Sequence, residues 1–386
     1  MDSIRRFCIA LDDNRDVFSA GDVVAGRVIL ELNRGIPCIK GMHIRFLGLV
    51  HVTWAEDFNK NAPVAPGTSF NAKEVYFDQI VTFLKNDRER QEDWNLQSGV
   101  HRFPFRLQIP DRNLPMSFEG KYGCVRYSLK CTIERSSGKN VYSKRALTVI
   151  GKHMDPNRVP NAKAPIVAQT EMSGGCLLCI SRPTTMLVRV QRKGYAPGNA
   201  IPLKVSINNN SNRRVHEVHA TLMQDVKYTA FGVRCGKTMN VCRSKEIIAT
   251  QSHTEGCQPH SKVTWNANLE IPPVPPSGLE GCDLIDTQYY LKIEAEVSHA
   301  KHNLLIEVPV VIGSKQLRHL EDSSTFTDLS PLAKFPSEES LHDEIMPPPS
   351  YREVYCGKVS ILDEADDEDT FGDLRFAPKY AYYMPD

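Results

Sequence analysis

The segment with the most specific binding chemistry lies near the C-terminus, where the sequence reads MPPPSY from Met346 to Tyr351. Its successive prolines fix φ near the polyproline II value and lack a backbone N–H, so the segment is extended before any partner binds. Because polyproline II has three residues per turn, Pro348 and Tyr351 fall on the same edge. WW domains bind such an edge in an aromatic groove. The motif Pro348, Pro349 and Tyr351 is therefore predicted to bind a WW domain.

A degenerate copy of this motif follows in the sequence APKY at 377–380. It keeps Pro378 and Tyr380 but lacks the first proline, so we predict a weaker second WW-binding site. As a second contact it would add avidity through effective concentration. The alternative interpretation of the three-proline segment is that its prolines merely keep a tail unfolded.

Thiols are the other reactive groups of the chain. The 11 cysteines are odd in number and scattered, and no apolar N-terminal run is long enough for a secretory signal. We expect reduced thiols, most of them buried as small apolar side chains. Cys176 and Cys179 form a CxxC pair, but zinc takes four ligands and no second pair accompanies them. No metal site and no cofactor is predicted, and redox use of this pair is the minority interpretation.

Signatures of catalysis and nucleic-acid binding are missing from the sequence. No Gly-rich phosphate loop follows a strand pattern, and no GxSxG elbow occurs. The basic clusters at 88–90 and 192–193 lack interleaved aromatic residues, so no nucleic-acid partner is expected. No apolar run approaches the ~18 residues of a membrane span. These features predict a non-enzymatic protein of the cytoplasm.

Charge divides the chain into a basic body and an acidic tail. From Ser314 to Asp386 there are 16 acidic and 7 basic side chains, a net charge of −9, which leaves +10 for residues 1–313 of the total of +1. A body with this positive charge is expected to attract anionic lipids or acidic, phosphorylated peptides. The alternative interpretation is that its lysines and arginines are dispersed and solvated. The acidic run 363–369 is predicted to be solvated and disordered, with an acidic contact as the minority interpretation.

The elements that must position these groups are predicted to be β-strands. Apolar residues alternate with polar ones at a period of two, for example at Ile44, Phe46, Val50 and Val52. Further strand patterns cover residues 7–11, 23–30, 74–84, 101–109, 122–134, 140–150, 186–190, 201–207, 289–297 and 304–312.

The two halves of this β-rich region repeat one another. FRLQIP at 105–110 matches ANLEIP at 267–272 with an offset of 162, and VIG at 149–151 matches VIG at 311–313 with the same offset. Tyr127 and the residues after it match Tyr290-Leu291-Lys292 loosely at an offset of 163. Three matches in one order indicate two related β-sandwiches in tandem.

We therefore predict an all-β fold of two tandem immunoglobulin-like β-sandwich domains followed by a disordered C-terminal tail. The predicted bounds are 5–152 for the first domain, 153–182 for a linker with a leading strand at Ile166 and Val167, 183–315 for the second domain and 316–386 for the acidic tail.

Several blocks of the sequence, taken in order, resemble the α-arrestins, the arrestin-domain-containing proteins that include thioredoxin-interacting protein. The blocks are GD at 21–22, YGCVRY at 122–127, RKGYAPG at 192–198, IPPVPPS at 271–277, GCDLI at 281–285 and VPVVIG at 308–313. The resemblance covers about residues 5–315 and extends to the Pro-Pro-x-Tyr motif of the tail. It implies that the two sandwiches are arrestin-type domains.

The resemblance implies an adaptor without chemistry of its own. In such proteins the tail motif, here Pro348, Pro349 and Tyr351, recruits HECT ubiquitin ligases of the Nedd4 type through their WW domains. The arrestin domains engage membrane receptors or transporters, which are then ubiquitinated and internalised. The implied location is the cytoplasm, with peripheral recruitment to the plasma membrane or endosomes. The loss of a proline before Tyr380 puts recruitment through two equal sites in doubt.

One branch of the family instead binds thioredoxin through a cysteine a few residues before a tryptophan that Trp265 resembles. In this chain residues 262–264 are Lys, Val and Thr, and the nearest thiol is Cys257. A reactive thiol also needs access and a lowered pKa. Thioredoxin binding through Cys257 is therefore the alternative function.

Overall fold

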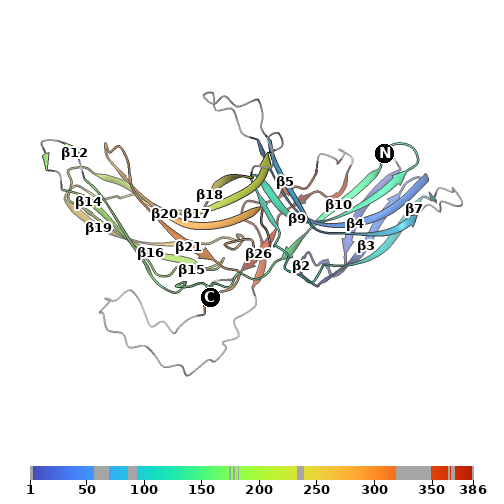
Figure 1. Cartoon of the computed structure of the whole chain (residues 1–386), viewed down its shortest axis with the longest axis horizontal. Helices are drawn as coiled ribbons and strands as arrows, with labels where there is room; N and C mark the ends of the chain where they lie inside the picture. Colours follow the sequence, from blue (N-terminus) through green and yellow to red (C-terminus); the bar gives the residue numbers. More distant parts are fainter. Residues whose placement is uncertain are drawn as a thin grey trace, which may run out of the picture.

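The computed structural model describes residues 3–55, 69–85, 94–173, 175–176, 179–180, 182–232, 239–318, 349–363, 366 and 370–384. Strands dominate these residues, and the only helical segments among them are two 3₁₀ turns, η1 (Asp12–Asn14) and η2 (Pro156–Arg158). Figure 1 shows the two sandwiches at opposite ends of an elongated molecule. The predicted all-β fold with two tandem sandwiches is confirmed.

The first domain is a sandwich of two sheets. A three-stranded sheet with the order β1-β3-β7 faces a larger one in which β5, β4, β9, β10 and β2 are neighbours. The strands are β1 (Ile4–Leu11), β2 (Val17–Ser19), β3 (Val23–Leu32), β4 (Ile36–Ala55), β5 (Ser69–Lys85), β6 (Trp94–Leu96), β7 (Gly99–Gln108), β8 (Phe118–Gly120), β9 (Gly123–Arg135) and β10 (Val141–Ile150).

The second domain repeats the plan with the four-stranded sheet β11-β14-β16-β19 facing β15, β21, β20, β17 and β18. The leading strand predicted at Ile166 and Val167 is β11, which pairs with β14. The strands are β11 (Ile166–Met172), β12 (Gly175–Cys176), β13 (Cys179–Ile180), β14 (Thr184–Val190), β15 (Gly194–Tyr195), β16 (Ala200–Asn209), β17 (Val215–Gly232), β18 (Met239–His253), β19 (Ser261–Glu270), β20 (Ile285–Val297) and β21 (Leu304–Ile312).

Alternation of apolar and polar side chains sends one face of each strand into a core. The pattern is strictest in β20, where Tyr289, Leu291, Ile293 and Ala295 are all buried. Each domain has its own apolar core. The strands β17 and β18 were not predicted. β18 is an edge strand with few buried side chains and therefore shows little alternation in hydrophobicity, whereas β17 is an interior strand with a buried apolar face.

The internal repeat is confirmed by two buried hydrogen bonds. The Tyr127 hydroxyl donates to the Pro115 carbonyl over 2.6 Å, and the Tyr289 hydroxyl donates to the Pro275 carbonyl over 2.7 Å. The two tyrosines are 162 residues apart, the offset of the other two repeated blocks. The match of Tyr127 with Tyr290 at an offset of 163 is therefore wrong by one residue, and the equivalent residue is Tyr289. Both donors are buried, so each bond satisfies groups that would otherwise be costly to desolvate.

A glycine turn repeats in the same way. The Gly21 N–H donates to the Ile109 carbonyl over 3.1 Å, and the Gly198 N–H donates to the Ile271 carbonyl over 2.8 Å. Both glycines have a positive φ, of 83° and 92°, which side chains with a Cβ adopt only with strain. This corner of the second domain lies against the tail.

The two domains share one continuous sheet. The end of β17 pairs with the start of β5, where Phe231 lies opposite Asn71. The rings of Tyr122 and Tyr228 meet edge to face with centroids 5.6 Å apart. Tyr228 also belongs to the core of the first domain, although its strand comes from the second. The domains are therefore joined by packed side chains as well as by the chain between them.

The C-terminal region differs in one respect from the disordered tail predicted for 316–386. Residues 319–348 lie outside the described residues, but most of 349–384 is described and packs on the body. It forms β22 (Ser350–Glu353), β23 (Val359–Ser360), β24 (Phe371–Asp373), β25 (Arg375–Phe376) and β26 (Lys379–Tyr382). In Figure 1 β26 lies between the two sandwiches. The physical reason is a set of ionic and aromatic contacts that a local sequence pattern does not reveal.

Candidate functional site: the tail docked on both domains

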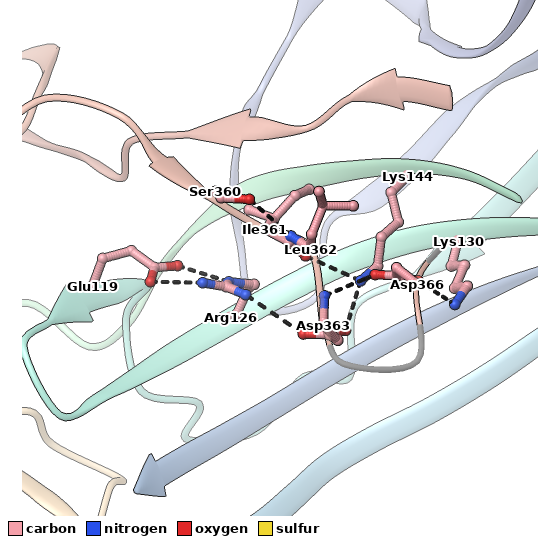
Figure 2. Close-up of polar contacts among 9 residues, drawn as sticks. All are labelled: Glu119, Arg126, Lys130, Lys144, Ser360, Ile361, Leu362, Asp363 and Asp366. Carbon is pink, nitrogen blue, oxygen red and sulfur yellow. Dashed lines mark hydrogen bonds and ion pairs between the residues drawn. The ribbon is translucent and has the colours of Figure 1, made fainter. Parts of the chain in front are cut away.

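The strongest anchor of the tail is Lys144 in β10, whose side chain is 4% exposed. Its ammonium group donates to the carboxylate of Asp363 over 2.6 Å, to the carboxylate of Asp366 and to the carbonyl of Ile361 over 3.0 Å. Figure 2 shows the ammonium group enclosed by these tail residues. A lysine buried this deeply is tolerable only with such partners, because an unpaired buried charge is strongly destabilising.

Asp366 is equally dependent on the body, since its side chain is fully buried. One carboxylate oxygen accepts from Lys144 and the other accepts from Lys130 in β9 over 2.6 Å. The Lys130 ammonium group also lies 4.1 Å from the centroid of the Tyr142 ring. The sequence-based prediction of solvated disorder is therefore wrong for Asp363 and Asp366, because they neutralise two lysines of the first domain.

A second ion pair flanks this anchor. Arg126 in β9 donates to both carboxylate oxygens of Glu119 in β8 over 2.8 Å each, in a bidentate geometry. The same guanidinium lies 3.9 Å from a carboxylate oxygen of Asp363. Figure 2 shows Arg126 between Glu119 and Asp363, so the tail adds a second carboxylate to an ion pair that the body already holds.

Two carboxyl groups near this anchor have pKa values shifted in opposite directions. Burial by itself would raise the pKa of Asp366, but hydrogen bonds from Lys130 and Lys144 outweigh it and lower that pKa. Burial raises the pKa of Glu119 and dominates over the opposing effect of Arg126. Asp366 is thus held as a carboxylate by the body, whereas Glu119 is destabilised in its charged form.

Strand pairing extends the docking beyond the ionic contacts. β24 pairs with β10 in parallel, with Phe371 opposite Ser143 and Gly372 opposite Lys144. Further along, the Lys379 N–H donates to the Thr148 hydroxyl over 3.2 Å. The Lys379 ammonium group donates to Asp16 over 2.7 Å. The tail therefore follows the edge of the first domain over the length of β10.

Tyr380, predicted as part of a weaker WW-binding site, is 5% exposed and belongs to the core of the first domain. Its hydroxyl donates to the Ser117 carbonyl over 3.2 Å. Pro378 is also buried, and its carbonyl accepts from the Val354 N–H over 2.9 Å. In the docked tail, neither side chain of this pair is available to an external groove.

Tyr351, the tyrosine of the complete motif, lies in β22, which pairs with β26. Tyr351 is opposite Ala381, and its half-buried ring packs against Ala196, Ala381 and Tyr383. Pro349 is partly exposed, and Pro348 lies outside the described residues. The structure thus brings the two predicted tyrosine segments together in one two-stranded sheet, which the sequence did not indicate.

The second domain holds the end of the tail through backbone groups. The Tyr383 N–H donates to the Pro197 carbonyl over 3.0 Å, and the Tyr383 hydroxyl donates to the Ser314 carbonyl over 2.9 Å. A Cβ at Gly198 would overlap the carbonyl oxygen of Tyr383. A second contact joins the Tyr355 N–H to the Pro273 carbonyl over 3.2 Å. The tail therefore crosses from one domain to the other and binds both.

Cys257, the thiol weighed for thioredoxin binding, is 2% exposed and packs in the core of the second domain. Its sulfur lies 3.3 Å from the Ser261 hydroxyl oxygen. Thiol exchange requires access to the sulfur, so this thiol is closed to a partner in the structure as folded. The backbone of Cys176 lies opposite that of Cys179 across a short hairpin.

Two other kinds of feature are absent from the part of the chain that the structure describes. No group of three or more His, Cys, Asp or Glu side chains in that part of the chain is arranged to hold a metal ion. In the same residues, no helix has the length and hydrophobicity required to cross a bilayer.

Two protein-family models match the two domains of this chain. The model of the arrestin (or S-antigen) N-terminal domain matches residues 7–156, and the model of the arrestin C-terminal domain matches residues 181–317. The chain belongs to the α-arrestin family. Among the relatives of this α-arrestin, mouse arrestin domain-containing protein 4 is 32% identical over 304 residues, which cover 78% of this chain and 70% of the relative.

Two further relatives of the α-arrestin align over almost its whole length. Arrestin domain-containing protein 17 of Caenorhabditis elegans is 24% identical over 442 residues, covering 99% of this chain and all of the relative. Thioredoxin-interacting protein of the pig is 26% identical over 403 residues, covering 99% of this chain and 94% of the relative. Both alignments therefore include the C-terminal tail, outside the two matched domains.

Sequence reasoning missed the residues that anchor the tail of this α-arrestin. Lys130 and Lys144 sit in strand patterns whose register is unknown from sequence, and Asp366 belongs to an acidic run of ordinary appearance. The available signal was the opposite net charge of body and tail. It pointed to an attraction between the two parts, without identifying the residues that meet.

Proposed function

We propose that this α-arrestin is an adaptor that recruits Nedd4-type HECT ubiquitin ligases to membrane receptors or transporters. Pro348, Pro349 and Tyr351 bind the WW domain of the ligase, and Pro378 and Tyr380 are a weaker second contact. The arrestin domains bind the cargo, which is ubiquitinated and internalised. The protein works in the cytoplasm and is recruited to the plasma membrane or endosomes, without a cofactor or a reaction of its own.

The observation that carries this proposal is a complete Pro-Pro-x-Tyr motif in a chain with two arrestin domains. The motif supplies the proline and tyrosine side chains that an aromatic groove binds. The domains supply a large β-surface for a second partner. The positive net charge of residues 1–313 supports an approach to anionic membranes or acidic cytoplasmic segments of cargo.

Thioredoxin binding is the weaker candidate. One relative is named thioredoxin-interacting protein, which gives the idea its basis. The burial of Cys257 speaks against it, because a mixed disulfide needs an accessible sulfur. Loss of function on changing Cys257, with Tyr351 dispensable, would favour this candidate over ligase recruitment.

The test of the adaptor proposal is a titration of a peptide spanning residues 341–359 with a Nedd4-type WW domain. We expect micromolar binding, which is typical of a short groove ligand. The same peptide with Tyr351→Ala is the control and should show no binding. If neither peptide binds, ligase recruitment through this motif is wrong, and partners must be sought through the arrestin domains.

A further inference from the structure

We propose that the docked tail hides its own WW-binding motifs, so that a WW domain binds only molecules in which β22 and β26 have left the body. This inference rests on the proposed function, since it concerns access to the same motif. It adds a closed state in which this adaptor does not recruit a ligase.

The first observation is that the two motif segments bind each other. β22 and β26 are antiparallel, with Tyr351 opposite Ala381 and Tyr380 opposite Arg352. The Arg352 guanidinium also lies 4.1 Å from the centroid of the Tyr382 ring. Backbone groups next to each tyrosine are therefore used by the other segment, so neither segment can enter a groove without separating from its partner.

The second observation is that the body covers the tyrosines. The Tyr380 ring lies in the core of the first domain and its hydroxyl is bonded to Ser117. The Tyr351 ring packs against Ala196 of the second domain and Tyr383 of the tail. A WW groove must surround the tyrosine and the preceding proline at the same time. The docked arrangement blocks that approach on the side where Tyr351 meets the body.

The third observation is that the closed state is held at both ends. Lys144 and Lys130 of the first domain bind Asp363 and Asp366, which follow β22 in the sequence. The second domain binds Tyr383 directly after β26. Release of β22 therefore competes with contacts to two domains, and the open fraction is set by their combined strength.

Docking of the tail should lower the apparent affinity of the full chain for a WW domain. When only a fraction of a protein is competent to bind, the apparent Kd rises in inverse proportion to that fraction. We expect the full chain to bind a WW domain at least roughly tenfold more weakly than the isolated 341–359 peptide, which has no body to dock on. Any change that weakens docking without touching the motif should reduce this difference.

The decisive variant is Gly198→Ala in the full chain. Its new Cβ would overlap the Tyr383 carbonyl, so it disfavours docking from the body side and leaves the motif intact. Gly138→Ala is the matched control, because Gly138 has a similar φ of 88° but no atom within 4 Å of its Cβ position. We expect Gly198→Ala to approach the affinity of the peptide and Gly138→Ala to equal the unchanged chain.

A second pair of variants tests the inference even if Gly198→Ala does not fold. Asp366→Asn removes the buried charge that Lys130 and Lys144 bind, whereas Asp373→Asn removes the charge of an exposed aspartate in the same tail. Both lie outside the 341–359 peptide. We expect tighter WW binding from Asp366→Asn and no change from Asp373→Asn.

The outcomes separate this inference from the proposed function. A peptide that does not bind overturns the proposed function and this inference with it. A peptide that binds, together with a full chain of equal affinity, overturns the inference alone. The inference also fails if the full chain is weaker but neither Gly198→Ala nor Asp366→Asn moves its affinity toward that of the peptide.

Discussion

The outer faces of the two domains carry different charge pairs on the same scaffold. In the first domain Lys130 of β9 lies directly opposite Lys144 of β10. In the second domain Lys292 of β20 lies directly opposite Glu307 of β21. Lys130 and Lys292 occupy equivalent positions, because each is three residues beyond the repeated tyrosine.

This difference explains why the ionic anchor of the tail lies on the first domain. Like charges directly opposite each other in a sheet repel, whereas opposite charges attract. The Lys130 and Lys144 pair is stabilised by an outside anion, which Asp366 supplies by binding both ammonium groups. Lys292 has acidic neighbours within its own domain, since it also pairs with Glu294 over 2.6 Å. The two domains thus differ in the residue opposite the equivalent lysine, which is Lys144 in the first and Glu307 in the second. This single difference leaves a positive pair on the first domain that binds the acidic tail.

The largest effect is expected from Lys144→Glu, which gives the first domain the charge pair of the second. The variant removes the buried partner of Asp366 and places a like charge beside it. Breaking a buried ion pair costs about 3 kcal/mol or more, so the tail should undock. Hydrogen exchange should show loss of amide protection in β24 and β26.

Lys292→Glu is the matched control for this charge reversal. It reverses the charge of a lysine on the second domain, at the position equivalent to Lys130, where the acidic neighbours Glu294 and Glu307 belong to that domain. Protection of β24 and β26 should be unaffected. If both variants release the tail equally, the like-charge pair of Lys130 and Lys144 is not the reason why the tail docks on the first domain.

A smaller difference is expected between the two repeated tyrosines. Tyr289 donates to Pro275 and also accepts from the Gln224 amide over 2.8 Å, whereas the contact of Tyr127 is with Pro115. Tyr289→Phe should therefore reduce the free energy of unfolding by about 2 kcal/mol and Tyr127→Phe by about 1 kcal/mol.

Urea unfolding with a constant slope measures both losses. The outcome that contradicts this prediction is an equal loss for the two variants, because the Gln224 contact would then contribute nothing to stability.

The pH dependence should separate the two carboxyl groups beside the anchor. The lowered pKa of Asp366 means that its contribution to docking is complete above the ordinary value of 3.8 and is lost as the pH falls through the lowered value. The raised pKa of Glu119 has the opposite sign, so protonation of Glu119 relieves a cost of burial as the pH falls.

Carboxyl carbon chemical shifts measured by NMR across a pH titration test both signs. Asp366 should titrate below 3.8 and Glu119 above 4.5. In Lys144→Glu the pKa of Asp366 should rise, since one of its two ammonium partners is gone. A pKa of Asp366 that is unchanged in this variant would show that the two groups do not interact in solution.

Much of the body followed from the sequence because alternation is a local property. The strand around Tyr289 and the strand around Phe46 were predicted from period-two patterns, and the tandem repeat from blocks that recur at 162 residues. The prediction missed β17 and β18. The edge strand β18 exposes side chains on both faces and carries little hydrophobic period, but β17 is an interior strand whose Val218, Ala220 and Leu222 are buried. The prediction also assigned disorder to the part of the tail that forms β22 to β26.

The sequence by itself determined the kinds of groups in this α-arrestin: two β-rich repeats, a Pro-Pro-x-Tyr motif and a tail of opposite charge to the body. Only the tertiary structure decided which of these groups meet. Lys144 and Asp366 are 222 residues apart, and the register of β9 against β10 decides that Lys130 faces the same carboxylate. The burial of Tyr380 depends likewise on a docking surface made by distant strands. Contacts of this range depend on the complete fold, so no local pattern records them.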